Sequence, residues 1–215
     1  MSYIALIGDI VASKSLSNRA AVQRRLTRCC AALNSRADAL RIISPFTVTL
    51  GDEFQALFAG DGADGIWSCI AEIEAEMYPV QIRFALGLGD IATEINREAA
   101  LAMDGPAFHR ARAGIETMKK DKVRYRLLGL HRGEGLVRHS LDMLSHNRDK
   151  WQQNRHRILS ALLQQQSIND IATKLGVSEQ AVYRNIRDGD LESVIGLMHE
   201  IGVLMTESLE QANEH

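Results

Sequence analysis

The sequence has few aromatic residues, few cysteines and few prolines. Aromatic residues make up 5% of its 215 residues, so a core must rely on Leu, Ile, Val and Ala. The three cysteines are Cys29, Cys30 and Cys69, with no Cys-x-x-Cys among them. This spacing fits neither a zinc site nor a disulfide framework, so we expect buried free thiols in a reducing compartment.

Long apolar segments are also missing. No run approaches the length of a membrane span, and the N-terminus lacks the basic region and apolar stretch of a signal peptide. The apolar content of 46% and charged content of 24% are typical of a globular protein. We therefore expect a cytoplasmic protein with no membrane span.

Charge is unevenly distributed along the second half of the chain. Residues 131–187 contain nine Lys or Arg against five Asp or Glu, a net charge of +4. Residues 188–215 contain no Lys or Arg and seven Asp or Glu, a net charge of −7. A basic segment followed by an acidic one favours nucleic-acid contact by the basic segment alone.

The spacing of apolar residues predicts the order β-α-β-β-α-β-α-β over the first 131 residues. This order contains the split ferredoxin-like unit, so we expect an α+β domain over 1–131. Strands are expected over 3–8, 46–58 (a hairpin), 81–88 and 122–128. Helices are expected from a cap at Ser15 or Ser17 to 39, over 63–77 and over 106–119, and 90–104 is left open.

Only helical patterns follow Gly135, so the second predicted domain, 132–215, is all-α. Residues 136–165 fit one long helix or two stacked ones. Ser167 begins a capping box, Gly176 suits a left-handed turn, and Ser178 can cap a second helix. Residues 167–187 therefore predict a helix-turn-helix.

The outer face of the second helix carries side chains that can contact base edges or phosphates. We expect DNA contacts from Ser178, Gln180, Tyr183, Arg184 and Arg187. The alternative is that this helical unit serves protein contact only.

A last helix is predicted over about 190–210. Its apolar stripe could form a homodimer interface, or it could pack on its own domain. The stripe consists of Leu191, Val194, Ile195, Met198, Ile201, Met205 and Leu209.

Two Gly-Asp elements stand at the edges of apolar strands. Gly8-Asp9 ends the first strand, and Gly51-Asp52-Glu53 lies in the hairpin, where Gly before Asp suits a two-residue type II′ turn. If these strands are neighbours, Asp9 and Asp52 converge, and paired carboxylates suit hard cations such as Mg²⁺ or Mn²⁺. Alternatively, Asp9 caps the following segment and Asp52 is an ordinary turn residue.

Four motifs together resemble the SatD family over essentially the whole chain. They are Gly8-Asp9-Ile10-Val11-x-Ser13-Lys14, Gly51-Asp52-Glu53-Phe54-Gln55, Arg83 to Gly89, and Asp104 to Arg112. The first 130 residues also resemble, more distantly, the catalytic domain of class III nucleotide cyclases and the GGDEF and palm-type polymerase domains. That resemblance implies a palm-type fold in which two aspartates hold metal ions against a nucleotide.

The resemblance also implies roles for individual residues. Asp9, the Ile10 carbonyl and Asp52 match the metal ligands. His109 stands where cyclases have a catalytic Asn, and Arg112 lies one place before their catalytic Arg. Asp9, Asp52, His109 and Arg112 are therefore candidate catalytic residues. The candidates for nucleotide contact are Lys14, Glu53, Arg110 and Arg112.

These features give three alternative functions. The leading hypothesis is a DNA-binding regulator whose N-terminal domain senses a metal–nucleotide ligand. The second is a metal-dependent nucleotidyl transferase or cyclase that uses the paired aspartates. The third is a non-catalytic interaction protein that dimerises through the last helix.

Overall fold

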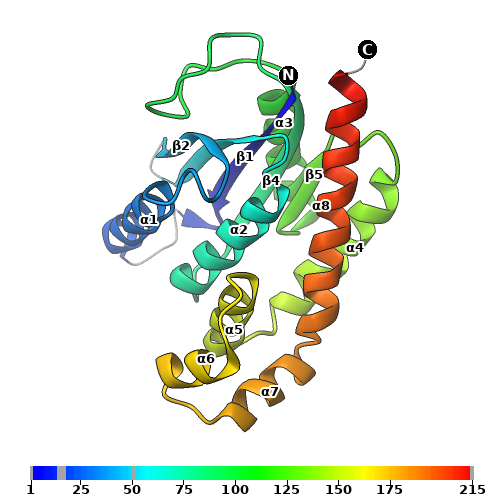
Figure 1. Cartoon of the computed structure of the whole chain (residues 1–215). Helices are drawn as coiled ribbons and strands as arrows, with labels where there is room; N and C mark the ends of the chain where they lie inside the picture. The colour runs from blue at the N-terminus through cyan, green and yellow to red at the C-terminus, as the bar shows by residue number, and fades with distance from the viewer. Residues whose placement is uncertain (1, 14–17, 50–51, 214–215) are drawn as a thin grey trace.

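The computed structural model describes residues 2–13, 18–49 and 52–213. Its N-terminal part is a five-stranded mixed sheet in the order β2-β3-β1-β4-β5 (Figure 1). β4 and β5 pair in parallel, and the other neighbouring strands pair antiparallel. The strands are β1 (Ser2–Ile10), β2 (Ile42–Val48), β3 (Glu53–Ala59), β4 (Ile82–Asp90) and β5 (Tyr125–Leu128).

Helices cover both faces of this sheet. Because side chains alternate along a strand, Ile4 and Leu6 join one buried cluster, while Ala5 and Ile7 join another. The first cluster includes side chains of α1 (Arg19–Asn34) and α2 (Ala63–Met77), and the second includes those of α3 (Pro106–Asp121). The predicted order β-α-β-β-α-β-α-β and the α+β class are confirmed.

The remaining chain is helical, as predicted. α7 lies at the end of the molecule farthest from the sheet in Figure 1, and α8 runs from there back to the sheet. There the Ser2 hydroxyl donates a hydrogen bond to the Asn213 side chain over 3.1 Å. The helices are α4 (Glu134–Arg148), α5 (Gln153–Leu163), α6 (Ile168–Leu175), α7 (Glu179–Asp188) and α8 (Leu191–Asn213).

The C-terminal helices share one buried cluster with the sheet. Leu159 of α5, Val182 of α7 and Met205 of α8 belong to the same apolar cluster as Ile4 and Trp67. A separate C-terminal domain is therefore not evident, and the boundary near residue 131 stays a prediction. No helix among the described residues is long and apolar enough to span a membrane.

Several predicted boundaries differ from the structure. The side chain of Asn18 caps α1, which ends at Asn34 rather than 39, and the proposed caps Ser15 and Ser17 lie outside the described residues. β2 begins at Ile42 rather than 46. Residues 136–165 form two helices, because the backbone becomes extended at Gln152.

The hairpin connection also differs from the prediction. The Thr49 amide donates a hydrogen bond to the Glu53 carbonyl over 2.8 Å, which leaves three residues between them. The expected two-residue type II′ turn is therefore wrong, although Leu50 and Gly51 themselves lie outside the described residues.

Gly8 lies inside β1 and does not end it. A Cβ at this position would lie 2.1 Å from the Phe54 ring, which crosses Gly8 from the paired position on β3. The glycine is needed for packing between strands, since any side chain would displace the buried ring. The three cysteines are buried and free as expected, and burial raises the pKa of Cys29 and Cys30 to about 12.

The apolar stripe of α8 packs on its own chain. Six of its seven members, Leu191, Val194, Met198, Ile201, Met205 and Leu209, are each no more than 6% exposed, and Ile195 is partly buried. Packing on its own chain, one of the two alternatives for this stripe, is therefore confirmed. It leaves little apolar surface for a homodimer interface, which stays a prediction.

A buried ionic cluster joins the sheet to the helices. Glu74 of α2 is 4% exposed and forms ion pairs with Arg148 of α4 and, over 3.4 Å, with Arg124. The Tyr125 hydroxyl of β5 donates to the same carboxylate. A single carboxylate thus pairs with two buried guanidinium groups from different parts of the fold.

The aromatic surroundings of this cluster come from the segment that begins α5. The Arg148 guanidinium lies 5.2 Å from the centre of the Trp151 ring, and His156 packs on the same ring at 5.4 Å. The pKa of His156 is lowered to about 4, mainly by burial and also by the nearby Arg148 and Arg124, against the opposing effect of Glu74. His156 is therefore neutral at pH 7 and adds no third positive charge.

Replacing Glu74 with Gln tests the importance of this cluster. The amide keeps the size of the side chain but leaves the buried Arg148 without its counter-charge, while Arg124 keeps its ion pair with Asp149 over 3.0 Å. Removing one partner of a buried pair typically costs about 3–5 kcal/mol, so we expect a loss of that order in the free energy of unfolding measured with urea. Asp61→Asn is the control, because the Arg41–Asp61 pair is exposed. Equal effects of the two substitutions would contradict a structural role for Glu74.

Candidate functional site at the end of β1

Asp9 lies between two charged residues at the end of β1. In the sheet register it pairs with Glu53 of β3 on one side and Arg83 of β4 on the other. Paired residues share a face of a sheet, so all three side chains project toward the face covered by α3. The alternation of side chains along three strands thus gathers these charges at one end of the sheet.

Both oxygens of the buried Asp9 carboxylate face cations. Arg83 Nη1 lies 2.9 Å from Oδ2, and Lys119 Nζ, from the last turn of α3, lies 3.5 Å from Oδ1. Because the Asp9 side chain is only 9% exposed, water does little to stabilise its negative charge, and these two cations stabilise it instead.

Asp52 stands at the neighbouring strand end. The Ile10 amide donates to the Asp52 carbonyl over 2.9 Å, and the Ser13 hydroxyl donates to the Asp52 carboxylate. Asp9 and Asp52 therefore lie on adjacent strand ends, as the sequence predicts. Their carboxylates, however, have separate partners within the protein.

Glu53 completes the set of charges. Its carboxylate pairs with Arg112 of α3, whose side chain is 45% exposed. Three carboxylates, those of Asp9, Asp52 and Glu53, are thus balanced by three cations, those of Arg83, Lys119 and Arg112. The described part of this site carries no net formal charge.

Two residues implied by the cyclase resemblance lie elsewhere. His109 forms an exposed pair with Asp104 over 2.6 Å, and the helical rise places it about 15 Å along α3 from Lys119. Arg110 donates to the Leu88 carbonyl, five residues along β4 from Arg83, or about 17 Å. The structure does not bring these residues to Asp9, because α3 runs along the sheet and its first turn lies at the opposite end. Their roles in catalysis and nucleotide contact stay predictions.

Two further residues belong to this site in the structure, although the sequence analysis does not predict a role for them. Arg83 and Ser13 belong to the motifs noted in the sequence, but only the strand register and the loop after β1 bring them to Asp9 and Asp52. A charged residue in an otherwise apolar strand was the available signal for Arg83. Lys14, expected to bind nucleotide, lies outside the described residues.

The residues at this site do not fit a two-metal centre as they stand. Among the described residues, no group of three or more His, Cys, Asp or Glu side chains could hold a metal ion. Asp9 is occupied by Arg83 and Lys119, and Asp52 accepts from Ser13. The proposed ligand set of Asp9, the Ile10 carbonyl and Asp52, with Mg²⁺ or Mn²⁺, therefore stays a prediction.

A second candidate surface lies on α7. The side chains of Ser167 and Ser178 accept hydrogen bonds from backbone amides at the starts of α6 and α7, and Gly176 between them is left-handed, with φ of 65°. These helix starts and this turn are as predicted. All five residues expected to contact DNA are exposed: Ser178, Gln180, Tyr183, Arg184 and Arg187.

Comparison with known proteins identifies one family. The model of the SatD family matches residues 3–188. No curated protein matches the sequence. Among solved structures, a bacterial light-regulated adenylyl cyclase is 18% identical, with a TM-score of 0.45, and the match covers 59% of this chain and 74% of that one. The guanylyl cyclase Cya2 is 13% identical, with a TM-score of 0.38 and coverage of 56% and 70%.

Replacing Arg83 with Met tests the electrostatic role of the Asp9 site. The substitution leaves a nearly buried carboxylate with Lys119 alone, so we expect the free energy of unfolding to fall by about 2–4 kcal/mol. Adding Asp9→Asn to Arg83→Met should recover part of this loss, because the unpaired charge is removed.

The control for this pair is Arg112→Met. The Arg112 side chain is 45% exposed, so we expect a loss below about 1 kcal/mol. Chemical denaturation measures all four variants. Additive effects of Asp9→Asn and Arg83→Met would contradict a coupled pair.

Proposed function

The chain belongs to the SatD family, and we propose that it is a DNA-binding regulatory protein that responds to a nucleotide. In this proposal α7 contacts DNA and the part of the chain built on the sheet carries the nucleotide site. The observation that supports it most is the free polar face of α7. Among the described residues, Gln180 and Arg184 of this helix have no side-chain hydrogen bond or ion pair within the chain.

The chemistry of this face suits DNA. Arg and Gln side chains can reach base edges in the major groove, and Arg can also bind phosphate. Only Val182 of α7 is fully buried, so one side of the helix anchors it while the other is open. Tyr183 is 56% exposed and adds an aromatic ring to the same open side.

The α7 face can be tested with random-sequence duplex DNA. We expect binding that weakens as the salt concentration rises, because arginine side chains that contact phosphates release counterions from the DNA. Arg184→Ala and Arg187→Ala should each weaken binding and lower the slope of log K against log salt by about one. Fluorescence anisotropy across a salt series measures both quantities.

The matched control is Arg19→Ala, which removes the same charge from an exposed position on α1. It should leave the affinity and the salt slope unchanged. Equal weakening by Arg19→Ala, or no salt-sensitive binding by the wild type, would contradict the proposal.

A metal-dependent nucleotidyl transferase is the second candidate. One observation favours it, the placement of Asp9 and Asp52 on neighbouring strand ends. The engagement of both carboxylates by other side chains speaks against it. We therefore expect no pyrophosphate release from ATP, GTP, CTP or UTP with Mg²⁺ or Mn²⁺. Release that disappears in Asp52→Asn would favour the enzyme over a regulator without catalysis.

A further inference from the structure

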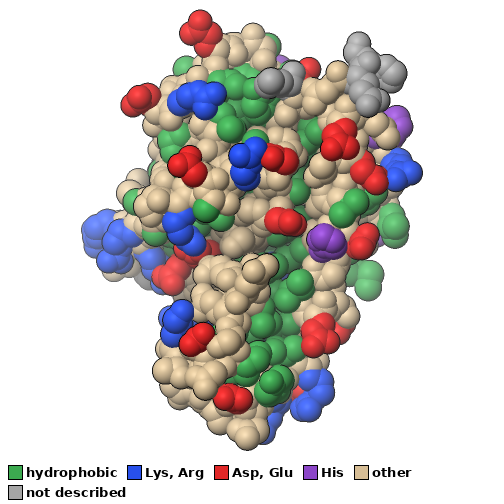
Figure 2. All heavy atoms as spheres, in the orientation of Figure 1, with side chains coloured by type: hydrophobic (Ala, Val, Ile, Leu, Met, Phe, Trp, Pro, Cys, Tyr) green, Lys and Arg blue, Asp and Glu red, His purple; other side chains and the backbone are tan. Residues whose placement is uncertain are grey.

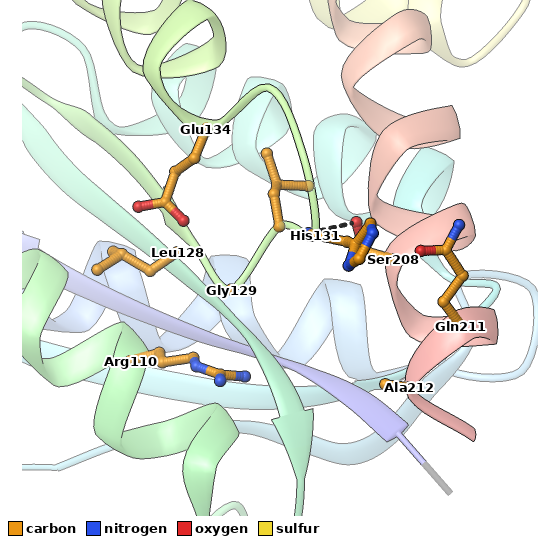
Figure 3. A pocket seen from close by; sticks show the side chains of 9 residues that line it. Arg110, Leu128, Gly129, His131, Glu134, Ser208, Gln211 and Ala212 are labelled. Carbon is orange, nitrogen blue, oxygen red and sulfur yellow. Dashed lines mark hydrogen bonds between the residues drawn. The ribbon is translucent and has the colours of Figure 1, made fainter. Parts of the chain in front are cut away.

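A cavity opens at the end of the sheet opposite Asp9. Its volume is about 750 Å³, and it lies between the first part of α3, the β5–α4 connection and the C-terminal part of α8 (Figure 3). Such a volume is within the range of small-molecule sites. Residues that line it include Arg110, Leu128, Gly129, His131, Glu134 and Gln211.

Arg110 is held in place by backbone. Its Nη1 donates to the Leu88 carbonyl, and the chain passes very close to its side chain at two glycines. A Cβ on Gly129 would lie 3.0 Å from Arg110 Cδ, and one on Gly89 would lie 3.0 Å from Nη1. Both glycines also have positive φ, 98° and 152°, which disfavours other residues. The two glycines therefore leave room for the Arg110 side chain, although this residue is itself exposed.

The guanidinium group keeps most of its hydrogen-bonding capacity. A guanidinium carries five N–H donors, and the Leu88 carbonyl is the acceptor found for Arg110 among the described residues. No described carboxylate forms an ion pair with it, in contrast to Arg83 and Arg112. An arginine with free donors beside a cavity is well suited to bind phosphate through two parallel hydrogen bonds.

The other walls limit the kind of anion. Leu128, Leu130 and Ala212 give an apolar surface, while Gln211 and His131 add polar groups. Glu134 places a negative charge on the rim, which disfavours a ligand with several negative charges. Ser208 is already occupied, since its hydroxyl accepts a hydrogen bond from the His131 amide over 3.0 Å (Figure 3). The same hydroxyl donates to the Leu204 carbonyl over 2.7 Å.

We propose that this cavity binds a nucleoside monophosphate, with its phosphate on Arg110. Glu134 accepts hydrogen bonds from the donor groups of the base or ribose, and Leu128 and Leu130 pack on the apolar face of the ring. A single phosphate suits one arginine opposite one glutamate, whereas a triphosphate would bring extra negative charge toward Glu134.

This cavity would be the ligand site of the proposed regulator, so any regulatory effect of the ligand rests on that proposal. The ligand would contact α8 near its C-terminal end, and α8 follows α7 after only two residues. Ligand binding itself requires no DNA, so it can be measured separately.

The test is calorimetric titration of the full chain with AMP, GMP, CMP and UMP, each compared with ATP and inorganic phosphate. At least one monophosphate should bind, and the corresponding triphosphate and inorganic phosphate should bind at least tenfold more weakly. Arg110→Ala should weaken the monophosphate at least tenfold. The matched control Arg19→Ala, which removes the same side chain from an exposed position on α1, should leave the affinity unchanged.

A second variant guards against misfolding of Arg110→Ala. Glu134→Gln, at an exposed position, should weaken the nucleoside monophosphate and should not weaken inorganic phosphate. Absence of binding by every monophosphate would overturn the proposal, as would unchanged binding in folded Arg110→Ala. Because no DNA is present, either result leaves the DNA-binding proposal untouched.

Discussion

The arrangement of the whole molecule depends on the buried carboxylate of Glu74. It pairs with Arg148 and Arg124, and it accepts from the Tyr125 hydroxyl. Charges in an apolar interior are costly unless paired, so α2, β5 and α4 can associate only where these groups meet. α4 follows β5 and precedes α5 in the chain. Its position therefore fixes the β5–α4 connection at one end and the segment that leads into α5 at the other. Both candidate binding surfaces thus depend on the same junction.

The strand β4 and the helix α3 serve two different sites. At one end, Arg83 and Lys119 neutralise Asp9, and the cluster is balanced internally. At the other end, Arg110 is held against the Leu88 carbonyl and is free of carboxylates among the described residues. A cluster whose charges are already paired offers an anion less than a guanidinium group without an ion pair beside a cavity. The Arg110 end of the sheet is therefore better suited to a phosphate group than the Asp9 end.

Local signals in the sequence were reliable where the interactions themselves are local. Ser167, Gly176 and Ser178 were sufficient to predict the starts of α6 and α7 and the turn between them, because caps and left-handed turns involve only neighbouring residues. The start of α1 was less predictable, because Ser15, Ser17 and Asn18 are all of residue types that cap helices, and the cap in the structure is Asn18. The role of Gly8 could not be predicted, because the ring that requires it belongs to Phe54 on another strand.

The order of strands and helices, the α+β class and the polar face of α7 could be predicted from consecutive residues alone, because they follow from apolar periodicity and capping. The packing of most of the α8 stripe on its own chain could not, and neither could the positions of Arg110 and Asp9 at opposite ends of the sheet. The reason is that register and helix direction place residues in space, so charges close in sequence to one motif can lie beside another.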